Sequence, residues 1–378
     1  MSQPILPGAT LGVLGSGQLG RMFAQAAQRM GYAVHVYSPD ANSPAGQVAH
    51  REFVGAYDDA ERLREFAKTV DVVTFEFENI PTAELGVIEE HVPLRPNARL
   101  LEATQERLRE KTALAKLGLP VAPHAAIETP EDLAGAAASV GLPGILKTSA
   151  FGYDGKGQRR ANDAAGLERA WEDLDRQRCV LERLIPFEFE ISVVGARGTG
   201  GELALYDPFQ NDHANHILDV TFAPAKIAPA TRDAAHEIAR GVLEGFDVVG
   251  VLCVEMFLLK DGSLILNEVA PRTHNSGHIT LDGHETSQFE QQVRAICGLP
   301  LGPVGLRRGG AAMANLLGEN WQAGEPNWKA ALEDQDVRLH LYGKSEARAG
   351  RKMGHLNACG LTADAARASV KAARARLT

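Results

Sequence analysis

Two glutamates flank a hairpin signal about two-thirds of the way along the chain. Apolar runs lie on both sides of Asp261-Gly262, and Asp-Gly in that context favours a tight β-turn. If the loop has two residues, Glu255 and Glu268 pair across the hairpin with Cβ atoms roughly 5 Å apart. Such carboxylates repel unless a cation binds both, whereas another register or solvated edge positions would separate them. We favour the first interpretation, which predicts a Mg²⁺ (or Mn²⁺) site at Glu255 and Glu268, with Asn267 as a further oxygen donor.

A lysine at the end of a short apolar strand precedes a glycine-rich loop. Lys147 ends the strand, and three glycines lie within 151–157. Such a loop lets amide N–H groups surround phosphate oxygens, and the lysine adds a fixed positive charge. By itself the loop could equally be a β-turn, and it lacks the spacing of a Walker A element. Beside a carboxylate hairpin it predicts an ATP site formed by Phe151, Gly152, Tyr153, Asp154, Gly155, Lys156 and Gly157.

The strand predicted at 179–184 has the features of an adenine-binding edge. Glu182 is placed to accept a hydrogen bond from an amino group, and the backbone near Leu184 would contact the ring. Glu190, a few residues later, would hold ribose hydroxyls. Out of this context, each glutamate would be interpreted as an ordinary surface charge.

A second cluster of polar side chains follows the metal hairpin directly. Arg272 can hold a small oxyanion by bidentate hydrogen bonds, and His274 and Asn275 add donors for developing charge. The pair His274 and His278 lacks a third ligand in a zinc pattern, so zinc is a minor alternative. Further along, Lys344, Arg351 and Lys352 form a basic cluster that is either a solvated surface or a loop folded over an anion.

The first strand ends in a glycine pattern, Gly15 to Gly20, with Asp40 about 20 residues later. This pattern fits a nicotinamide-dependent dehydrogenase, and it equally fits a phosphate bound at a helix N-terminus. In the second interpretation the phosphate lies at Gly17, Gln18 and Leu19. Glu76, after another parallel strand, is either a ligand-binding acid or a surface acid.

The elements that must position these residues indicate an α/β protein. Strands at 11–14, 33–37 and 70–77 alternate with helical patterns, which predicts a parallel Rossmann-like sheet. Helices are expected at 104–117 and 232–243, and strands at 145–147, 179–184 and through 194. We expect three domains, at 1–105, 106–300 and 301–378.

Composition restricts the class of protein. The 378 residues are 44% hydrophobic and 23% charged, as in an ordinary globular protein, and contain no apolar run long enough to span a membrane. No secretory signal is indicated. The net charge of −9 disfavours a nucleic-acid surface. Four widely spaced cysteines suggest reduced thiols and a cytoplasmic location.

With these motifs together, the chain resembles the ATP-grasp superfamily, and most closely its N5-carboxyaminoimidazole ribonucleotide synthetase family. The resemblance covers nearly the whole chain and is most specific in the motif at 267–278. It implies an ATP-grasp fold with a Rossmann-like N-terminal domain and a small C-terminal domain, usually as a homodimer. It also implies carboxylation of 5-aminoimidazole ribonucleotide with MgATP and bicarbonate, through carboxyphosphate, in purine biosynthesis.

The resemblance implies roles for individual residues. Those on the ATP-binding pattern are Arg107, Lys147, the 151–157 loop, Glu182, Arg183, Leu184, Ile185, Glu190, His213, Asn267 and Glu268. Those expected to act in catalysis are Tyr153, Asp154, Arg272, His274, Asn275 and Lys352. Those expected to hold the ribonucleotide are Gly17, Gln18, Leu19, Glu76, Asp154, Arg272, Ser276, Lys344, Arg351 and Lys352.

Three alternatives stay open at this point. A formate-dependent glycinamide ribonucleotide transformylase shares the ATP-grasp pattern, although the His-Asn-Ser-Gly-His segment fits the carboxylating family better. A dehydrogenase would leave the acid pair and the 151–157 loop unexplained. A nucleotide sensor without catalysis would be expected to lack the acid pair or Lys147, and both are present.

Overall fold

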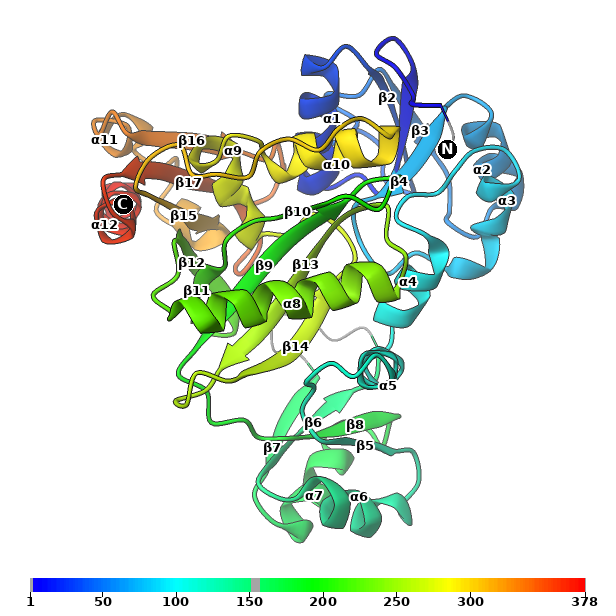
Figure 1. The fold of residues 1–378 in the computed structure, drawn as a ribbon, viewed down its shortest axis with the longest axis vertical. Coiled ribbons are helices and arrows are strands. Elements are labelled where there is room, and N and C mark those ends of the chain that lie inside the picture. Colours follow the sequence, from blue (N-terminus) through cyan, green and yellow to red (C-terminus); the bar gives the residue numbers. More distant parts are fainter. Residues whose placement is uncertain (1–2, 151–156, 378) are drawn as a thin grey trace.

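The computed structural model describes residues 3–150 and 157–377 (Figure 1). The N-terminal part is a four-stranded parallel sheet in the order β3-β2-β1-β4. Its strands are β1 (Thr10–Leu14), β2 (Ala33–Ser38), β3 (Arg51–Val54) and β4 (Val72–Phe75), with helices α1 (Gln18–Arg29), α2 (Ala60–Ala67), α3 (Gly86–Glu89) and α4 (Ala98–Thr104). The predicted parallel sheet is confirmed. Strand β3 was not predicted, because as a half-exposed edge strand it lacks a buried apolar run.

A small antiparallel sheet follows, in the order β5-β8-β6-β7. It consists of β5 (His124–Ile127), β6 (Gly144–Thr148), β7 (Gln158–Ala161) and β8 (Cys179–Arg183), accompanied by α5 (Arg107–Lys116), α6 (Asp132–Val140) and α7 (Ala164–Glu172). Ile145 of β6 pairs with Glu182 of β8, and Lys147 pairs with Val180. Lys147 and Glu182 are therefore diagonal neighbours on one face of this sheet.

A nine-stranded sheet continues from the central part into the C-terminal part, in the order β14-β13-β9-β11-β12-β15-β17-β16 with β10 beside β9. Its strands are β9 (Phe189–Arg197), β10 (Leu203–Leu205), β11 (Phe209–Ala214), β12 (Ile217–Ala223), β13 (Gly250–Leu258), β14 (Leu264–Ala270), β15 (Gly310–Leu317), β16 (Val337–Leu341) and β17 (Lys352–Gly360). Strand β12 pairs antiparallel with β15. The segment beyond residue 300 therefore continues the central sheet, which positions β17 relative to the carboxylate hairpin.

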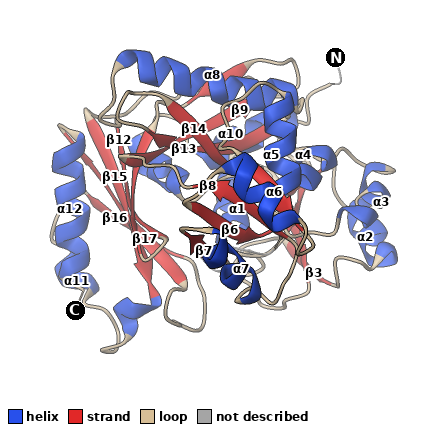
Figure 2. Ribbon diagram, turned by 90° about the horizontal axis from the view of Figure 1, so that it is seen from below, coloured by secondary structure: helices blue, strands red, loops and turns tan. Residues whose placement is uncertain are grey.

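Helices cover this sheet selectively. They are α8 (Pro229–Gly245), α9 (Thr280–Gly283), α10 (Gln288–Cys297), α11 (Trp328–Ala331) and α12 (Ala363–Ala375). Figure 2 shows α8 across one face of the central strands and α12 alongside β15. Ile191, Val193 and Val254 pack in the core with α8 residues. Because side chains alternate along a strand, Glu190, Ser192 and Glu255 must point to the opposite face. No helix among the described residues is long and apolar enough to cross a membrane.

The hairpin has a three-residue loop, so the predicted two-residue loop is wrong. The Leu259 amide donates to the Ser263 carbonyl at 2.9 Å, and Gly262 has φ +83°, as in a turn that ends in a left-handed residue. The inner pairs are shifted by one residue relative to the prediction. A bulge at Asn267 then restores the register, so that Glu255 still pairs with Glu268.

Candidate active site

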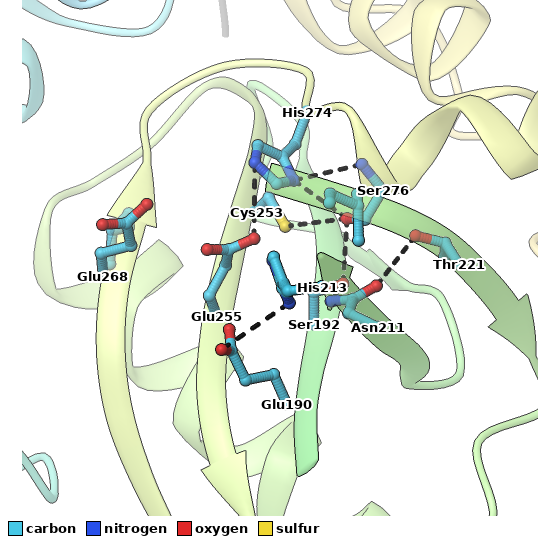
Figure 3. Close-up of polar contacts among 12 residues, drawn as sticks. Glu190, Ser192, Asn211, His213, Thr221, Cys253, Glu255, Glu268, His274 and Ser276 are labelled. Carbon is cyan, nitrogen blue, oxygen red and sulfur yellow. Dashed lines mark hydrogen bonds and ion pairs between the residues drawn. The ribbon is translucent and has the colours of Figure 1, made fainter. Parts of the chain in front are cut away.

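Three carboxylates share the sheet face opposite α8. Glu255 and Glu268 are paired across the hairpin, and Glu190 lies on the adjacent strand β9 (Figure 3). Burial raises the pKa of Glu255 well above its ordinary value, and repulsion from Glu268 and Glu190 raises it further. Burial and the Glu268 charge raise the pKa of Glu190 to about 7. The three carboxylates on this face therefore repel one another, and this repulsion favours a bound cation.

The residues present fit a magnesium ion that shares its ligands with a substrate. Among the described residues, no group of three or more His, Cys, Asp or Glu side chains is arranged to hold a metal ion. The Glu255–Glu268 pair supplies two carboxylates, and Mg²⁺ commonly takes one or two protein carboxylates together with substrate phosphates and water. Arg107 Nη1 lies 3.6 Å from Glu268 Oε2 and adds a positive charge on the same side.

A buried ion cluster lies on the small antiparallel sheet. Lys147 Nζ donates to Glu182 Oε2 at 3.0 Å, and Lys111 Nζ lies 3.6 Å from the same oxygen. Burial alone would raise the pKa of Glu182, but the two ammonium groups outweigh it and lower that pKa to about 2. The other oxygen, Glu182 Oε1, is buried and has no hydrogen-bond partner among the described residues. It is therefore able to accept from an amino group, as predicted for adenine.

Two residues of this cluster were missed by the sequence interpretation. Lys111 is buried in α5 and donates to the Asn267 carbonyl that the bulge turns toward it. Glu110, also buried, accepts from the Val269 amide at 2.7 Å, and burial raises its pKa to about 7. With Leu114 they form the buried face of the helix. The sequence signal for these two residues was a pair of charges on the helix face that also carries Leu114, where apolar residues are normally found.

The segments predicted to bind adenine and ribose make the following contacts within the protein. The Leu184 amide donates to the Pro143 carbonyl at 3.1 Å, and Arg183 Nε donates to the Val140 carbonyl at 2.7 Å. At the position predicted for the ribose, His213 Nδ1 lies 3.7 Å from Glu190 Oε1. Residues 151–156 of the predicted phosphate loop at 151–157 lie outside the described residues.

Within that loop only Gly157 is described, and it has a left-handed φ of +71°. A Cβ atom added there would lie 2.5 Å from Thr148 Oγ1. The position therefore requires glycine.

His274 and Asn275 lie beside the face that carries the three carboxylates. His274 Nε2 is 3.4 Å from Glu255 Oε1 (Figure 3). Burial lowers the pKa of His274 well below its ordinary value, and the charges of Arg272 and Lys352 lower it further. Both polar atoms of the Asn275 side chain are buried without a hydrogen-bond partner among the described residues. An unsatisfied amide at this point favours a polar ligand.

Ser276 and Arg272 have protein partners of their own. Ser276 is fully buried behind His274, where its hydroxyl contacts Ser192. Arg272 donates through Nε to Glu78 Oε2 at 2.7 Å, and its Nη2 lies 2.6 Å from the same oxygen. Glu78 follows β4, so this pair joins the N-terminal sheet to the segment after the hairpin. Glu78 was not among the predicted site residues.

The glycine pattern at the start of α1 holds a carboxylate of the protein itself. Glu76 accepts hydrogen bonds from the Gly17 amide and, at 2.9 Å, from the Gly20 amide. A Cβ atom at Gly17 would lie 2.7 Å from Glu76 Oε1, which explains the glycine. In a dinucleotide-binding fold the pyrophosphate takes this position. The dehydrogenase interpretation is therefore disfavoured, and the predicted phosphate contacts at Gln18 and Leu19 lie next to an acid.

The C-terminal basic cluster approaches that acid. Lys344 Nζ donates to the Lys352 carbonyl at 2.7 Å. Burial and the charge of Arg351 lower the pKa of Lys344 to about 8, against the opposing effect of the Glu76 charge. Arg351 Nη1 donates to the Glu346 carbonyl at 3.0 Å. Lys344 thus lies near the N-terminal sheet, and all three cationic residues are half-buried.

Family models match three successive parts of the chain. The ribonucleotide synthetase preATP-grasp domain matches residues 8–105, the ATP-grasp domain matches 112–289, and the phosphoribosylaminoimidazole carboxylase C-terminal domain matches 311–369. The expected ATP-grasp fold with its N-terminal Rossmann-like domain is confirmed.

Named relatives match over almost the full length. The N5-carboxyaminoimidazole ribonucleotide synthase of Bacillus subtilis (strain 168) is 43% identical over 354 residues, which cover 94% of this chain and 92% of the relative. An N5-carboxyaminoimidazole ribonucleotide synthetase solved as an ADP complex has a TM-score of 0.92 at 42% identity, covering 99% of this chain and 98% of that one. The Aspergillus clavatus synthase, solved with ADP and 5-aminoimidazole ribonucleotide, has a TM-score of 0.89 at 33% identity, covering 98% of each chain. The chain therefore belongs to the N5-carboxyaminoimidazole ribonucleotide synthase family of ATP-grasp enzymes.

Proposed function

We propose that the protein carboxylates the exocyclic amine of 5-aminoimidazole ribonucleotide, using ATP and bicarbonate and releasing ADP and phosphate. The observation that carries this proposal is the buried Glu255–Glu268 pair facing His274 and the unsatisfied Asn275 amide. A metal-bound nucleotide phosphate and a small oxyanion are the ligands that such a face would accept.

In the first stage, a bicarbonate oxygen attacks the γ-phosphorus and the bond to the ADP oxygen breaks, which gives carboxyphosphate. Glu255 and Glu268 would hold Mg²⁺, which neutralises charge on the transferred phosphoryl group. Lys147 and Arg107 add positive charge, and Glu182 Oε1 accepts from the adenine amino group. The remaining proposed ATP contacts are the 151–157 loop, Arg183, Leu184, Ile185, Glu190, His213 and Asn267.

In the second stage, the amine nitrogen attacks the carboxyl carbon and inorganic phosphate leaves. We assign to Asn275 and His274 the hydrogen bonds to the carboxyl oxygens, and Arg272 would contribute the N–H groups that Glu78 leaves available. We assign the amine proton to Asp154, with Tyr153 beside it. Whether carboxyphosphate or CO₂ released from it is captured, the stoichiometry is the same.

The ribonucleotide is proposed to lie between the N-terminal sheet and β17. Glu76 would orient the ribose or the amine, and Lys344, Arg351 and Lys352 would bind the phosphate. Gly17, Gln18 and Leu19 line the same region. The proximity of Lys344 to Glu76, seen in the effect of each charge on the other group's pKa, supports one continuous site.

The proposals for the domain bounds, the oligomeric state and the cellular location rest on the family. Domain bounds of 1–105, 106–300 and 301–378 are supported by the three matched ranges. A homodimer is proposed, and light scattering would give twice the mass of one chain. A cytoplasmic location is proposed because the reaction belongs to purine biosynthesis.

Phosphate release tests the proposed activity. We expect ATP hydrolysis to rise sharply with 5-aminoimidazole ribonucleotide plus bicarbonate. Glycinamide ribonucleotide plus formate should give only the basal rate. The opposite result would identify a formate-dependent transformylase instead, and no phosphate release above the uncatalysed rate with either substrate would favour a nucleotide-binding module without catalysis.

The pH dependence of ribonucleotide capture should follow Lys344. Below its pKa of about 8 the side chain is charged and can bind a phosphate, and above it the charge is lost. We therefore expect kcat/KM for the ribonucleotide to fall as the pH rises through about 8, since kcat/KM reports the free enzyme. The fall should be absent in Lys344→Arg, which stays charged. A flat wild-type profile to pH 9, or an equal fall in the arginine variant, would contradict this assignment.

A further inference from the structure

Behind His274 lies a row of buried polar side chains that the proposed chemistry does not use. His274 Nδ1 is 2.9 Å from Ser276 Oγ, and Ser192 Oγ is 2.9 Å from Ser276 Oγ (Figure 3). Asn211 Nδ2 lies 3.0 Å from Ser192 Oγ, and Thr221 Oγ1 lies 2.9 Å from Asn211 Oδ1. The row crosses β9, β11 and β12, and its four members other than His274 are at most 3% exposed.

Such a row can run in two directions, and one backbone contact selects between them. The Ser276 amide donates to His274 Nδ1 at 3.3 Å. A backbone N–H can only donate, so Nδ1 must be an acceptor and carries no proton. If Nδ1 carried a proton, its N–H would face the N–H of Ser276, and two donors would oppose each other.

The remaining directions follow because each hydroxyl has a single proton. Ser276 gives its proton to Nδ1, a stronger acceptor than Cys253 Sγ at 3.7 Å, and therefore accepts from Ser192. Ser192 must then accept from the Asn211 amide nitrogen. This leaves the Asn211 oxygen to accept from Thr221, so every bond runs toward the imidazole.

We propose that the row Thr221–Asn211–Ser192–Ser276 is a positioning device that holds His274 as the tautomer protonated on Nε2. The imidazole then presents an N–H toward Glu255 Oε1, 3.4 Å away, and toward any oxyanion bound beside it. His274 acts as a hydrogen-bond donor and not as the base that removes the amine proton. This inference rests on the proposed function for its oxyanion, but the tautomer itself does not depend on the substrate.

The tautomer can be read directly in the full-length protein. Long-range ¹H–¹⁵N correlation spectra of protein labelled with ¹⁵N-histidine distinguish a protonated from an unprotonated ring nitrogen, and His274→Gln assigns the signal. We expect a protonated Nε2 and an unprotonated Nδ1, with a shift toward the other tautomer in Ser192→Ala. A proton on Nδ1 in the wild-type protein would overturn the proposal, whatever the substrate proves to be.

A double-mutant cycle separates positioning from general packing. Ser192→Ala should lower kcat about 10-fold, which is the usual effect of removing a residue that orients a functional side chain. The KM for ATP should be unchanged. In a His274→Ala background the same change should cost nothing further, because the row acts only through the imidazole. Thr221→Val should behave like Ser192→Ala.

Thr231→Val is the matched control. It removes another buried threonine hydroxyl, which donates to the Gly262 carbonyl at 3.1 Å and belongs to α8, on the opposite face of the central sheet from Ser192. Its effect on kcat should be small and the same in both backgrounds. If Ser192→Ala and His274→Ala instead lower kcat by independent factors that multiply, the row is merely structural and the proposal fails.

Discussion

Glu255→Gln is expected to lower MgATP turnover by about 10³-fold while making the protein without ligands more stable. The two effects have one cause. Glu255 is held at 7% exposure against Glu268, and the repulsion between the two charged carboxylates is relieved by a proton or by a bound cation. Glutamine has the same shape but no charge, so it removes both the repulsion and a ligand for the metal.

The sign of the stability change follows from the raised pKa. In the folded protein the carboxyl binds its proton more tightly than in the unfolded chain, so ionisation costs stability as the pH rises above the unfolded value near 4.5. At pH 8 the glutamine variant avoids that cost, and we expect its free energy of unfolding to rise by about 1–3 kcal/mol. Chemical denaturation without Mg²⁺ and ATP measures it.

Two further measurements complete this test. Addition of MgATP should raise the unfolding temperature of the wild-type protein and leave that of the variant nearly unchanged. Glu237→Gln, at an exposed helix position, should alter neither turnover nor stability. Retention of wild-type Mg²⁺ dependence in Glu255→Gln would rule out the metal-binding role.

The hairpin shows what local patterns can and cannot supply. Alternation of side chains on a strand placed Glu255 and Glu268 opposite each other, and this pairing is confirmed. The loop is one residue longer than predicted, and the bulge at Asn267 restores the predicted register at Glu255 and Glu268. The residues around 267 give no sequence signal for that bulge, and the ammonium group that binds the Asn267 carbonyl comes from Lys111, a residue distant in sequence.

Contacts between distant segments account for the other omissions. The pairing of β12 with β15 depends on the whole sheet, so a separate C-terminal unit was the natural expectation. Ser192, Asn211 and Thr221 are ordinary polar residues in sequence, and only their packing behind His274 makes them a connected row. Glycine-rich motifs were recognisable because local backbone geometry demands them, whereas buried polar networks depend on which strands become neighbours.

Removing the Glu182 carboxylate is expected to lower the free energy of unfolding by about 3–5 kcal/mol, because Lys111 and Lys147 are left buried without a counter-charge. The free energy of unfolding that Glu182 contributes depends on pH in the opposite direction to that of Glu255. The pKa of Glu182 is lowered to about 2, so its contribution is complete above about pH 4.5 and lost as the pH falls toward 2. Glu182→Ala should therefore destabilise the protein at pH 7 and reduce the further loss on acidification.

Denaturant unfolding of three variants without nucleotide tests this argument. Lys111→Met should cost less than Glu182→Ala, since Glu182 keeps Lys147 at 3.0 Å and methionine fills the space of the lysine stem. Glu172→Ala breaks the exposed pair with Arg176 and should change the free energy of unfolding by no more than about 0.5 kcal/mol. If Glu182→Ala were no more harmful than Glu172→Ala, the two lysines could not both be charged. The positive charge assigned to Lys147 at the nucleotide phosphates would then have to come from Arg107 alone.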